Sequence, residues 1–135
     1  MLTVQLPYPP SLNRLYRHVG KRVIISAEGR RYASAVNDAV SAALAAGQVV
    51  PPAPHAATLL ATPPDRRRRD LDNLPKRLLD LTYKAMSSDE KKYDDSQVVR
   101  LVVEWRLNSG APGVTVLLRP ARFVNGVVQV LEDAA

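Results

Sequence analysis

Four stretches of the chain have the apolar pattern of β-strands. In residues 99–107 apolar and polar side chains alternate, which is the clearest strand pattern in the sequence. Residues 3–6 and 114–118 are predicted to be further strands, and residues 56–61, small and apolar, a buried one. A turn rich in glycine and proline separates the strand at 99–107 from that at 114–118, so we expect these two to form a hairpin.

Two longer stretches carry apolar side chains at spacings of three and four, which is the period of an amphipathic α-helix. The first begins after Ser26, a good N-cap residue, and ends at Gly47. The second is predicted over residues 73–86, with Pro75 in its first turn, where a missing N–H costs little. Asp72 is then expected to be the N-cap, with its carboxylate near the positive end of the helix dipole.

The order of these elements is strand, helix, strand, helix, strand, strand. It predicts a single α+β domain in which two main helices cover a mixed β-sheet. Asn125-Gly126 between two apolar pairs is a strong signal for a two-residue hairpin, which adds a short ribbon at the C-terminus. We see no internal repeat and no second domain.

Composition narrows the class of protein. The chain has 135 residues, enough for one domain with one sizeable core. Its 19 Lys and Arg exceed its 13 Asp and Glu, and the formal charge of +6 favours an anionic partner, nucleic acid before an anionic membrane surface. No apolar run approaches the ~20 residues that span a bilayer, no signal peptide is evident, and the absence of cysteine excludes disulfides and thiolate zinc sites. We expect a cytoplasmic, nucleoid-associated protein with no membrane partner.

The most informative stretch is residues 65–76, DRRRRDLDNLPK. Asp70 and Asp72 offer two oxygen ligands for a hard metal ion, and Lys76 places an ammonium group near the start of the second helix. The arginine run suits the phosphates of a polyanion. This grouping predicts phosphodiester chemistry. The arginines concerned are Arg66, Arg67, Arg68 and Arg69.

Each part of this stretch also has a simpler explanation. A run of arginines is often a solvated loop, Asp72 taken alone is more often a helix cap, and Lys76 could merely pair with Asp80 one turn on. Four like charges beside two acids nevertheless make little sense as structure alone, because the cations repel one another. Their adjacency favours a surface where a polyanion docks.

Residues 11–18 form a second candidate for binding. The simpler interpretation is a surface loop. The functional interpretation is a loop that faces DNA, in which arginines meet phosphates and an aromatic ring packs on a sugar or a base. The residues concerned are Asn13, Arg14, Tyr16, Arg17 and His18.

The sequence resembles the RusA family of Holliday junction resolvases. The resemblance is carried by residues 65–76, and by residues 94–99 (DDSQVV), which match a D-D-x-Q-V pattern. Residues 9–18 (PPSLNRLYRH) and 26–29 (SAEG) are also similar to that family. It extends over about residues 6–106.

The same resemblance suggests how the chain divides. We expect residues 1–119 to form a RusA-like endonuclease domain. Residues 120–135 are then a C-terminal extension, made of the short hairpin and a tail.

The resemblance implies a homodimeric, Mg²⁺-dependent endodeoxyribonuclease that cuts four-way DNA junctions, with Mn²⁺ a possible alternative ion. It implies that Asp70, Asp72 and Asp95 are catalytic carboxylates that bind the metal, with Asp94 a weaker candidate. Lys76 would be the essential basic partner.

Element order does not by itself bring these carboxylates together, because the second helix carries the chain across the sheet between them. Their meeting is therefore a hypothesis. Two other functions stay open: a non-catalytic protein that binds branched DNA, and a metal-dependent nuclease that acts on other branched DNA or on RNA. A basic protein at a membrane surface is a weaker alternative, since no cationic amphipathic helix is evident.

Overall fold

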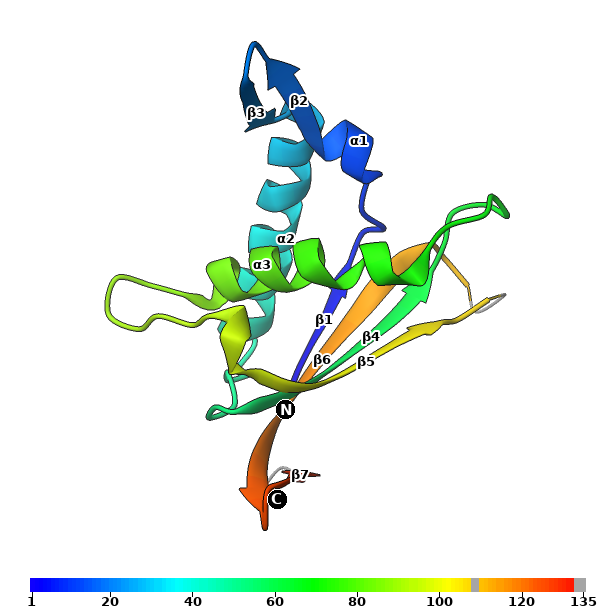
Figure 1. Cartoon of the computed structure of the whole chain (residues 1–135). Coiled ribbons are helices and arrows are strands. Elements are labelled where there is room, and N and C mark those ends of the chain that lie inside the picture. The colour runs from blue at the N-terminus through cyan, green and yellow to red at the C-terminus, as the bar shows by residue number, and fades with distance from the viewer. Residues whose placement is uncertain (108–109, 133–135) are drawn as a thin grey trace.

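The structure is a computed structural model, and it describes residues 1–107 and 110–132 (Figure 1). Two of its elements, η1 and η2, are single turns of 3-10 helix. In chain order the elements are β1 (Leu2–Leu6), α1 (Leu12–Leu15), β2 (Tyr16–Val19), β3 (Arg22–Ile25), α2 (Ala27–Ala45), β4 (His55–Thr62), η1 (Leu71–Asn73), α3 (Pro75–Met86), η2 (Asp95–Gln97), β5 (Val98–Trp105), β6 (Gly113–Val124) and β7 (Val127–Val130).

The main sheet is mixed, as predicted. Its strand order is β1-β6-β4-β5, and β7 pairs with the far end of β6. β4 and β5 run parallel, with Leu59 opposite Val103, whereas the β1–β6 and β4–β6 pairs are antiparallel. α3 makes the crossover that a parallel pair requires. β4 is buried along most of its length because it has a strand on each side.

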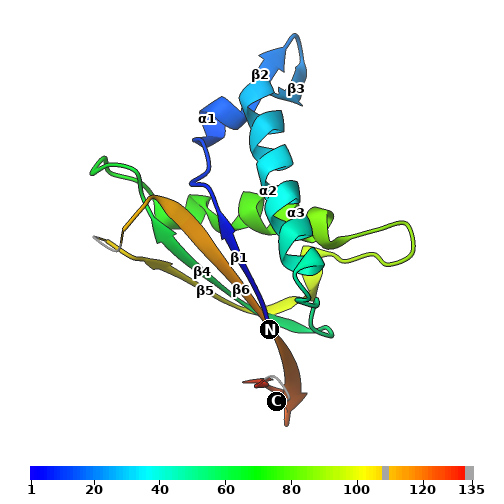
Figure 2. The ribbon, with the colours of Figure 1, turned by 180° about the vertical axis from the view of Figure 1, so that it is seen from behind.

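The two long helices form the second layer, and they cross each other in both views (Figures 1 and 2). The core lies where Val36 and Val40 of α2 and Leu78 of α3 meet Leu59 and Leu118 of the sheet, all five with 0% exposure. Burial of each such side chain contributes about 1.5–3 kcal/mol. The predicted α+β class and the order of the main elements are therefore confirmed.

The expected hairpin between residues 99–107 and 114–118 is wrong. β5 and β6 are not neighbours, because β4 lies between them and pairs with both. Sequence proximity favoured the hairpin, but the crossover through α3 delivers β5 to the outer edge of the sheet. Leu101 on this edge strand is accordingly 42% exposed, although it is apolar.

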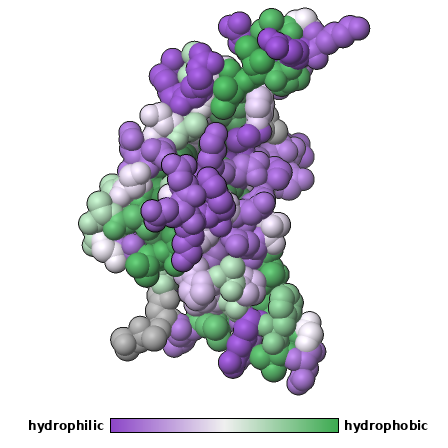
Figure 3. Space-filling view, turned by 90° about the vertical axis from the view of Figure 1, so that its left-hand side faces the viewer, coloured by the Kyte–Doolittle hydropathy of each residue, from purple (hydrophilic) through white to green (hydrophobic). Residues whose placement is uncertain are grey.

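The C-terminal ribbon is confirmed. Phe123 pairs with Val128, and Asn125 and Gly126 both have positive φ angles, 52° and 78°, as a tight two-residue hairpin requires. β6 runs without a break from the sheet into this ribbon, which projects from the domain (Figure 1). Apolar atoms are prominent on the projecting end (Figure 3), where Val127 is 65% exposed. The predicted tail beyond the hairpin includes residues 133–135, which lie outside the described residues.

The expected loop over residues 11–18 is also wrong. Its first part is the short helix α1, and its second part is strand β2, whose Tyr16 pairs with Ile25 of β3. The pattern gave no sign of a strand because Arg17 and the two residues after it are exposed. This small hairpin stands at the opposite end of the molecule from the C-terminal ribbon (Figures 1 and 2).

α1 is fixed to the start of α2. The Ser26 side chain accepts a hydrogen bond from Gly29 N–H at 2.9 Å, which confirms the predicted N-cap, and its hydroxyl donates to the Arg14 carbonyl. The Ser26 N–H donates to the Leu15 carbonyl at 2.8 Å. A Cβ atom on Gly29 would lie 2.5 Å from the Leu15 oxygen, so this close approach requires glycine.

Within residues 1–107 and 110–132, no helix combines the length and the apolar character that crossing a bilayer requires.

Candidate active site

Asp65 organises the arginine-rich loop between β4 and η1. Its carboxylate accepts a hydrogen bond from the Arg67 N–H at 2.9 Å and forms ion pairs with Arg67 Nε at 3.2 Å and Arg69 Nη2 at 2.8 Å. The Arg67 N–H is the main reason that the pKa of Asp65 lies below its usual value, and the two guanidinium groups lower the pKa further. Two of the four arginines are thus partly neutralised within the loop.

The other two arginines of the run have no carboxylate partner in the described part of the chain. Among the described residues, neither Arg66 nor Arg68 has a side-chain hydrogen bond or ion pair. Arg66 lines a hollow beside Trp105 on the β5 side of the loop. Arg68 lines the main cleft instead, so the run divides between two surfaces.

The main cleft has a volume of about 980 Å³. It lies between the N-terminal segment, the start of α2, the arginine loop and the first turn of α3. Glu28 and Asp70 are its acidic lining residues, and six arginines outnumber them, so the cleft suits a polyanion. The arginines are Arg14, Arg31, Arg67, Arg68, Arg69 and Arg77.

Most of the predicted DNA-binding residues therefore share one surface. Asn13 and Arg14 line the cleft together with three arginines of the loop. Tyr16 lies next to it, beneath the guanidinium of Arg77. Arg17 is exposed on β2 and does not line the cleft.

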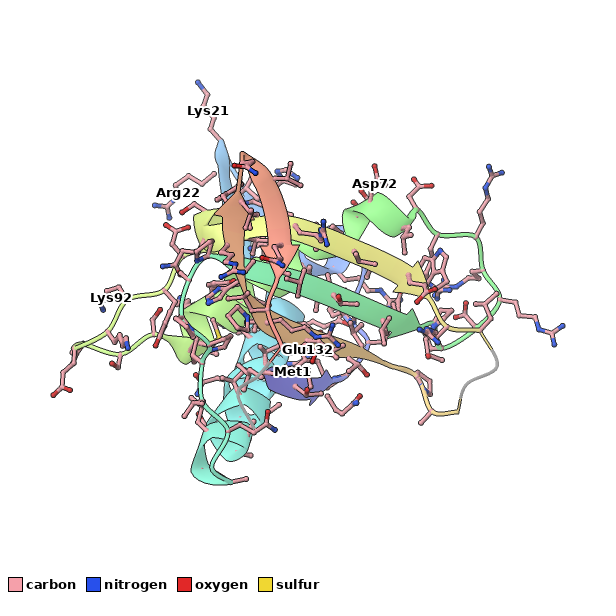
Figure 4. The ribbon with its side chains drawn as sticks, turned by 90° about the horizontal axis from the view of Figure 1, so that it is seen from below. Met1, Lys21, Arg22, Asp72, Lys92 and Glu132 are labelled. Atoms are coloured by element: carbon pink, nitrogen blue, oxygen red, sulfur yellow. The ribbon has the colours of Figure 1, made fainter. Side chains whose placement is uncertain are left out.

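Asp70 and Asp72 flank the passage from the loop into α3. Both are exposed, and neither carboxylate has a hydrogen bond or ion pair within the described part of the chain. Asp72 lies in η1, which rests against β5 (Figure 4). The expectation that Asp72 caps the helix is wrong: α3 begins at Pro75, its N-cap is Leu74, and no side chain caps it. Both carboxylates are thus available to a ligand.

The carboxylates of Asp94 and Asp95 make different contacts. Asp94 caps η2: its Oδ1 accepts from Ser96 N–H at 2.9 Å, and Gln97 Oε1 accepts from Asp94 N–H at 3.2 Å. This reciprocal capping gives the D-D-x-Q pattern a structural reason. It also fixes Asp95 in the turn that leads directly into β5.

Asp95 meets Lys76, which α3 contributes. Lys76 Nζ lies 3.1 Å from Asp95 Oδ2 and 3.2 Å from Asp80 Oδ1. The hydrogen bond to Asp95, followed by that to Asp80, raises the pKa of Lys76 above its usual value. The simple i+4 pairing with Asp80 is thus present, and Lys76 also contacts Asp95, which the sequence analysis did not predict.

A buried pair supports this part of α3 from beneath. His55 Nδ1 lies 2.6 Å from the Tyr83 hydroxyl, and His55 Nε2 lies 2.7 Å from the Pro51 carbonyl oxygen. A carbonyl can only accept, so Nε2 carries the proton and Nδ1 accepts from Tyr83. Burial, and then the nearby charge of Asp95, raise the pKa of Tyr83. The hydroxyl therefore stays protonated and ties α3 to β4.

The donor set has the right chemistry for a hard divalent cation, since carboxylate oxygens are the preferred ligands and two of the three predicted carboxylates are unengaged. However, the structure does not bring these side chains together into one cluster. In the described ranges, no three Asp, Glu or His residues are grouped closely enough to hold one ion. The convergence of Asp70, Asp72 and Asp95 on a metal stays a prediction.

Sequence reasoning missed some residues of this region. Nothing in the local sequence distinguishes Asp65, because its role depends on the loop folding back on itself. Arg77 was not singled out, because a lysine-arginine pair at the start of a helix is common on solvated faces. Its contact with Tyr16 joins segments that are far apart in the sequence.

The chain matches the family model described as Endodeoxyribonuclease RusA over residues 7–119. It belongs to the RusA family. Crossover junction endodeoxyribonuclease RusA of Escherichia coli strain K12 is 40% identical over 103 residues, which cover 75% of this chain and 83% of that protein. The protein of the same name from Shigella sonnei strain Ss046 is 41% identical with the same coverage. The phage HK97 protein is 36% identical over 96 residues, 70% of this chain and 78% of its own length.

The RusA match includes every part of the cleft described above. It spans the α1 segment, the arginine loop, α3 and η2. It ends within β6, so the ribbon formed by residues 120–130 lies beyond it.

Proposed function

We propose that this RusA-family protein is an endodeoxyribonuclease that resolves four-way DNA junctions by paired hydrolysis of phosphodiesters. The observation that carries this proposal is the arginine-lined cleft, which Asp70 lines with an unengaged carboxylate, together with a second unengaged carboxylate, Asp72, two positions on in η1. Curated relatives named crossover junction endodeoxyribonucleases match three quarters of the chain. A protein with this substrate would work in the cytoplasm, at the nucleoid.

We further propose that Asp70, Asp72 and Asp95 hold a divalent cation, Mg²⁺ or Mn²⁺. When bound, the cation supplies a water of lowered pKa and neutralises charge on the scissile phosphate. Asp94 contributes indirectly, because its cap holds the turn in which Asp95 lies. The acids are therefore assigned different roles although they are adjacent in sequence.

The other charged residues of α1, the arginine loop and α3 bind and orient the DNA. Arg68 and Arg14 both line the cleft, and in this proposal they bind phosphates that flank the scissile bond, so affinity should fall steeply with salt. Lys76 is a cation beside Asp95 and suits the stabilisation of negative charge that builds up on the phosphate. Asp65 keeps two arginines of the loop in place.

Two symmetric cuts require two sites, and the described residues of one chain supply one set of the predicted carboxylates. We propose a homodimer whose two-fold axis matches that of the junction. Sedimentation at micromolar concentration is expected to show a dimer. A monomer that still cuts both strands in step would contradict the paired arrangement.

A substrate panel tests the function. Labelled four-way junction, fork, duplex and RNA are incubated with the protein, with Mg²⁺ and with a chelator. We expect cleavage of the junction alone or far ahead of the others, and no cleavage in the chelator. Faster cutting of the fork or of RNA would favour a nuclease with another substrate, and binding without any cutting would favour a non-catalytic protein.

A further inference from the structure

Arg77 is a cation without a counter-charge. Its side chain is half-buried, its Nε atom is buried without a hydrogen-bond partner, and no ion pair involves it within residues 1–107 and 110–132. Asp80, the acid three positions along the helix, is bound to Lys76 instead. The contact that Arg77 does make is with an aromatic ring: its guanidinium carbon lies 4.4 Å from the centroid of Tyr16.

This arrangement is unusual on physical grounds. A guanidinium taken out of water loses hydration, and proteins normally compensate with a carboxylate or with hydrogen-bond acceptors. A ring face attracts a cation but accepts none of its N–H groups in the way that oxygen does. A group left in this condition in a folded protein calls for an explanation, such as an ion or ligand that completes it.

The position of Arg77 indicates which ligand that is. Arg77 lines the main cleft, as do Arg68 and Arg14. The cleft is cationic, so an anion would be held by several charges at once. Stacking on Tyr16 keeps the planar fork in one orientation before any ligand arrives, and such a fork matches the two free oxygens of a phosphate.

We propose that Arg77, held on the ring of Tyr16, is a binding residue for a backbone phosphate of the DNA in the cleft. This role rests on the proposed function, because it takes DNA to be the ligand of the cleft. Tyr16 is then a positioning residue: it links the β2–β3 hairpin to α3 and orients the guanidinium. The alternative is a structural brace, in which the stacked pair merely fastens the hairpin to the helix.

Binding and stability together separate these two roles. The affinity for a synthetic four-way junction is measured in a chelator over a range of salt concentrations, and thermal unfolding is measured without DNA. The variants are Arg77→Met and Arg77→Lys. Lys92→Met is the matched control, because it removes one charge from an exposed loop outside the cleft, on the opposite side of the view from Asp72 (Figure 4).

We expect Arg77→Met to weaken binding about tenfold and to reduce the salt slope of log K by about one. Its melting temperature should stay the same or rise, because an uncompensated half-buried charge is gone. Arg77→Lys should keep the salt slope but bind more weakly than wild type, since it lacks the fork. Lys92→Met should bind within about twofold of wild type. Equal affinity and slope for Arg77→Met and Lys92→Met would overturn the proposal, as would a lower melting temperature with an unchanged slope.

A double-mutant cycle tests the part played by Tyr16. Tyr16→Phe keeps the ring and should bind like wild type, whereas Tyr16→Leu should lose most of what Arg77→Met loses. The two losses should not add in the double variant, because one residue acts through the other. Full additivity would show that Tyr16 contacts DNA independently and does not position Arg77.

These measurements are separate from the test of the enzymatic function. If wild type binds the junction in an Arg77-dependent way but never cuts it, the phosphate site stands and the nuclease proposal falls. If wild type cuts the junction and Arg77→Met binds as well as wild type, the nuclease proposal stands and the phosphate site falls. If wild type binds no DNA, both proposals fail.

Discussion

Lys76 Nζ and Asp95 Oδ2 are 3.1 Å apart although their residues are 19 positions apart in the sequence. This contact joins the first turn of α3 to the turn before β5, and so connects the two motifs that carry the family resemblance. The Lys76 side chain is 76% exposed, and exposed ion pairs contribute little to stability. Its position beside Asp95 therefore points to function more than to folding.

Replacing Lys76 should accordingly affect activity and not folding. We expect Lys76→Met to abolish junction cleavage while its midpoint of urea unfolding stays close to that of wild type. Lys84→Met, a change in the last turn of the same helix at a lysine that forms no ion pair with Asp95, is the control and should retain cleavage. An unfolding midpoint that falls together with activity would mean that Lys76 acts mainly as a structural tie.

Loss of the buried contact between Tyr83 and His55 should, by contrast, lower the stability of the fold. Tyr83→Phe removes the hydroxyl that donates to His55 Nδ1 and leaves a fully buried acceptor unsatisfied. We expect the free energy of unfolding to fall by about 1–3 kcal/mol. Urea denaturation followed by circular dichroism measures it, and a variant as stable as wild type would show that this hydrogen bond is dispensable.

The raised pKa of Tyr83 also predicts how the stability of the protein depends on pH. Burial raises the pKa of Tyr83 above the usual 10.0, so above that pH the unfolded chain loses a proton that the folded chain keeps. The unfolded state then binds fewer protons, and stability falls as pH rises, by at most about 1.4 kcal/mol per pH unit for one group. Tyr83→Phe should show a shallower fall between pH 10 and 11. Part of the fall should remain, because the pKa values of Tyr8, Tyr32 and Lys76 are also raised. Identical slopes would contradict the raised pKa.

The close contact at Gly29 predicts a local defect. A Cβ there would meet the Leu15 carbonyl oxygen at 2.5 Å and Ile25 Cγ1 at 2.9 Å, so Gly29→Ala must push α1 away from α2. We expect the free energy of unfolding to fall by about 1–3 kcal/mol and junction binding to weaken, because α1 carries Asn13 into the cleft. The control is Ser34→Ala, on the exposed side of α2. Gly47→Ala would not serve, because Gly47 has a φ of 100° and any side chain there is strained. Unchanged stability would mean that α1 shifts freely.

The sequence predicted those features that depend on local pattern. Ser26 and the apolar spacing after it indicated α2, and Asn125-Gly126 indicated the ribbon, because each is determined by nearby residues. The D-D-x-Q-V pattern was recognised, but the division of labour between Asp94 and Asp95 was not. Only the folded turn shows one carboxylate capping η2 and the other facing Lys76.

Features that depend on tertiary contacts were missed. The strand at 99–107 was paired with its neighbour in sequence, because nothing local indicates that β4 lies between β5 and β6. β2 and β3 are short and largely exposed, so they lack the alternation that marks a strand. The stacking of Arg77 on Tyr16 likewise needs α3 and the hairpin to be brought together.

The central claim is that Asp70 and Asp72 are catalytic carboxylates and that the DNA is bound through other residues. The direct measurement compares junction cleavage in Mg²⁺ with junction binding in a chelator for Asp70→Asn and Asp72→Asn, with Asp89→Asn in the exposed loop after α3 as the control. We expect both site variants to lose cleavage to below detection. They should bind the junction as tightly as wild type or more tightly, because each removes a negative charge near phosphates. The control should cut normally. Cleavage at the wild-type rate by either site variant would contradict the account.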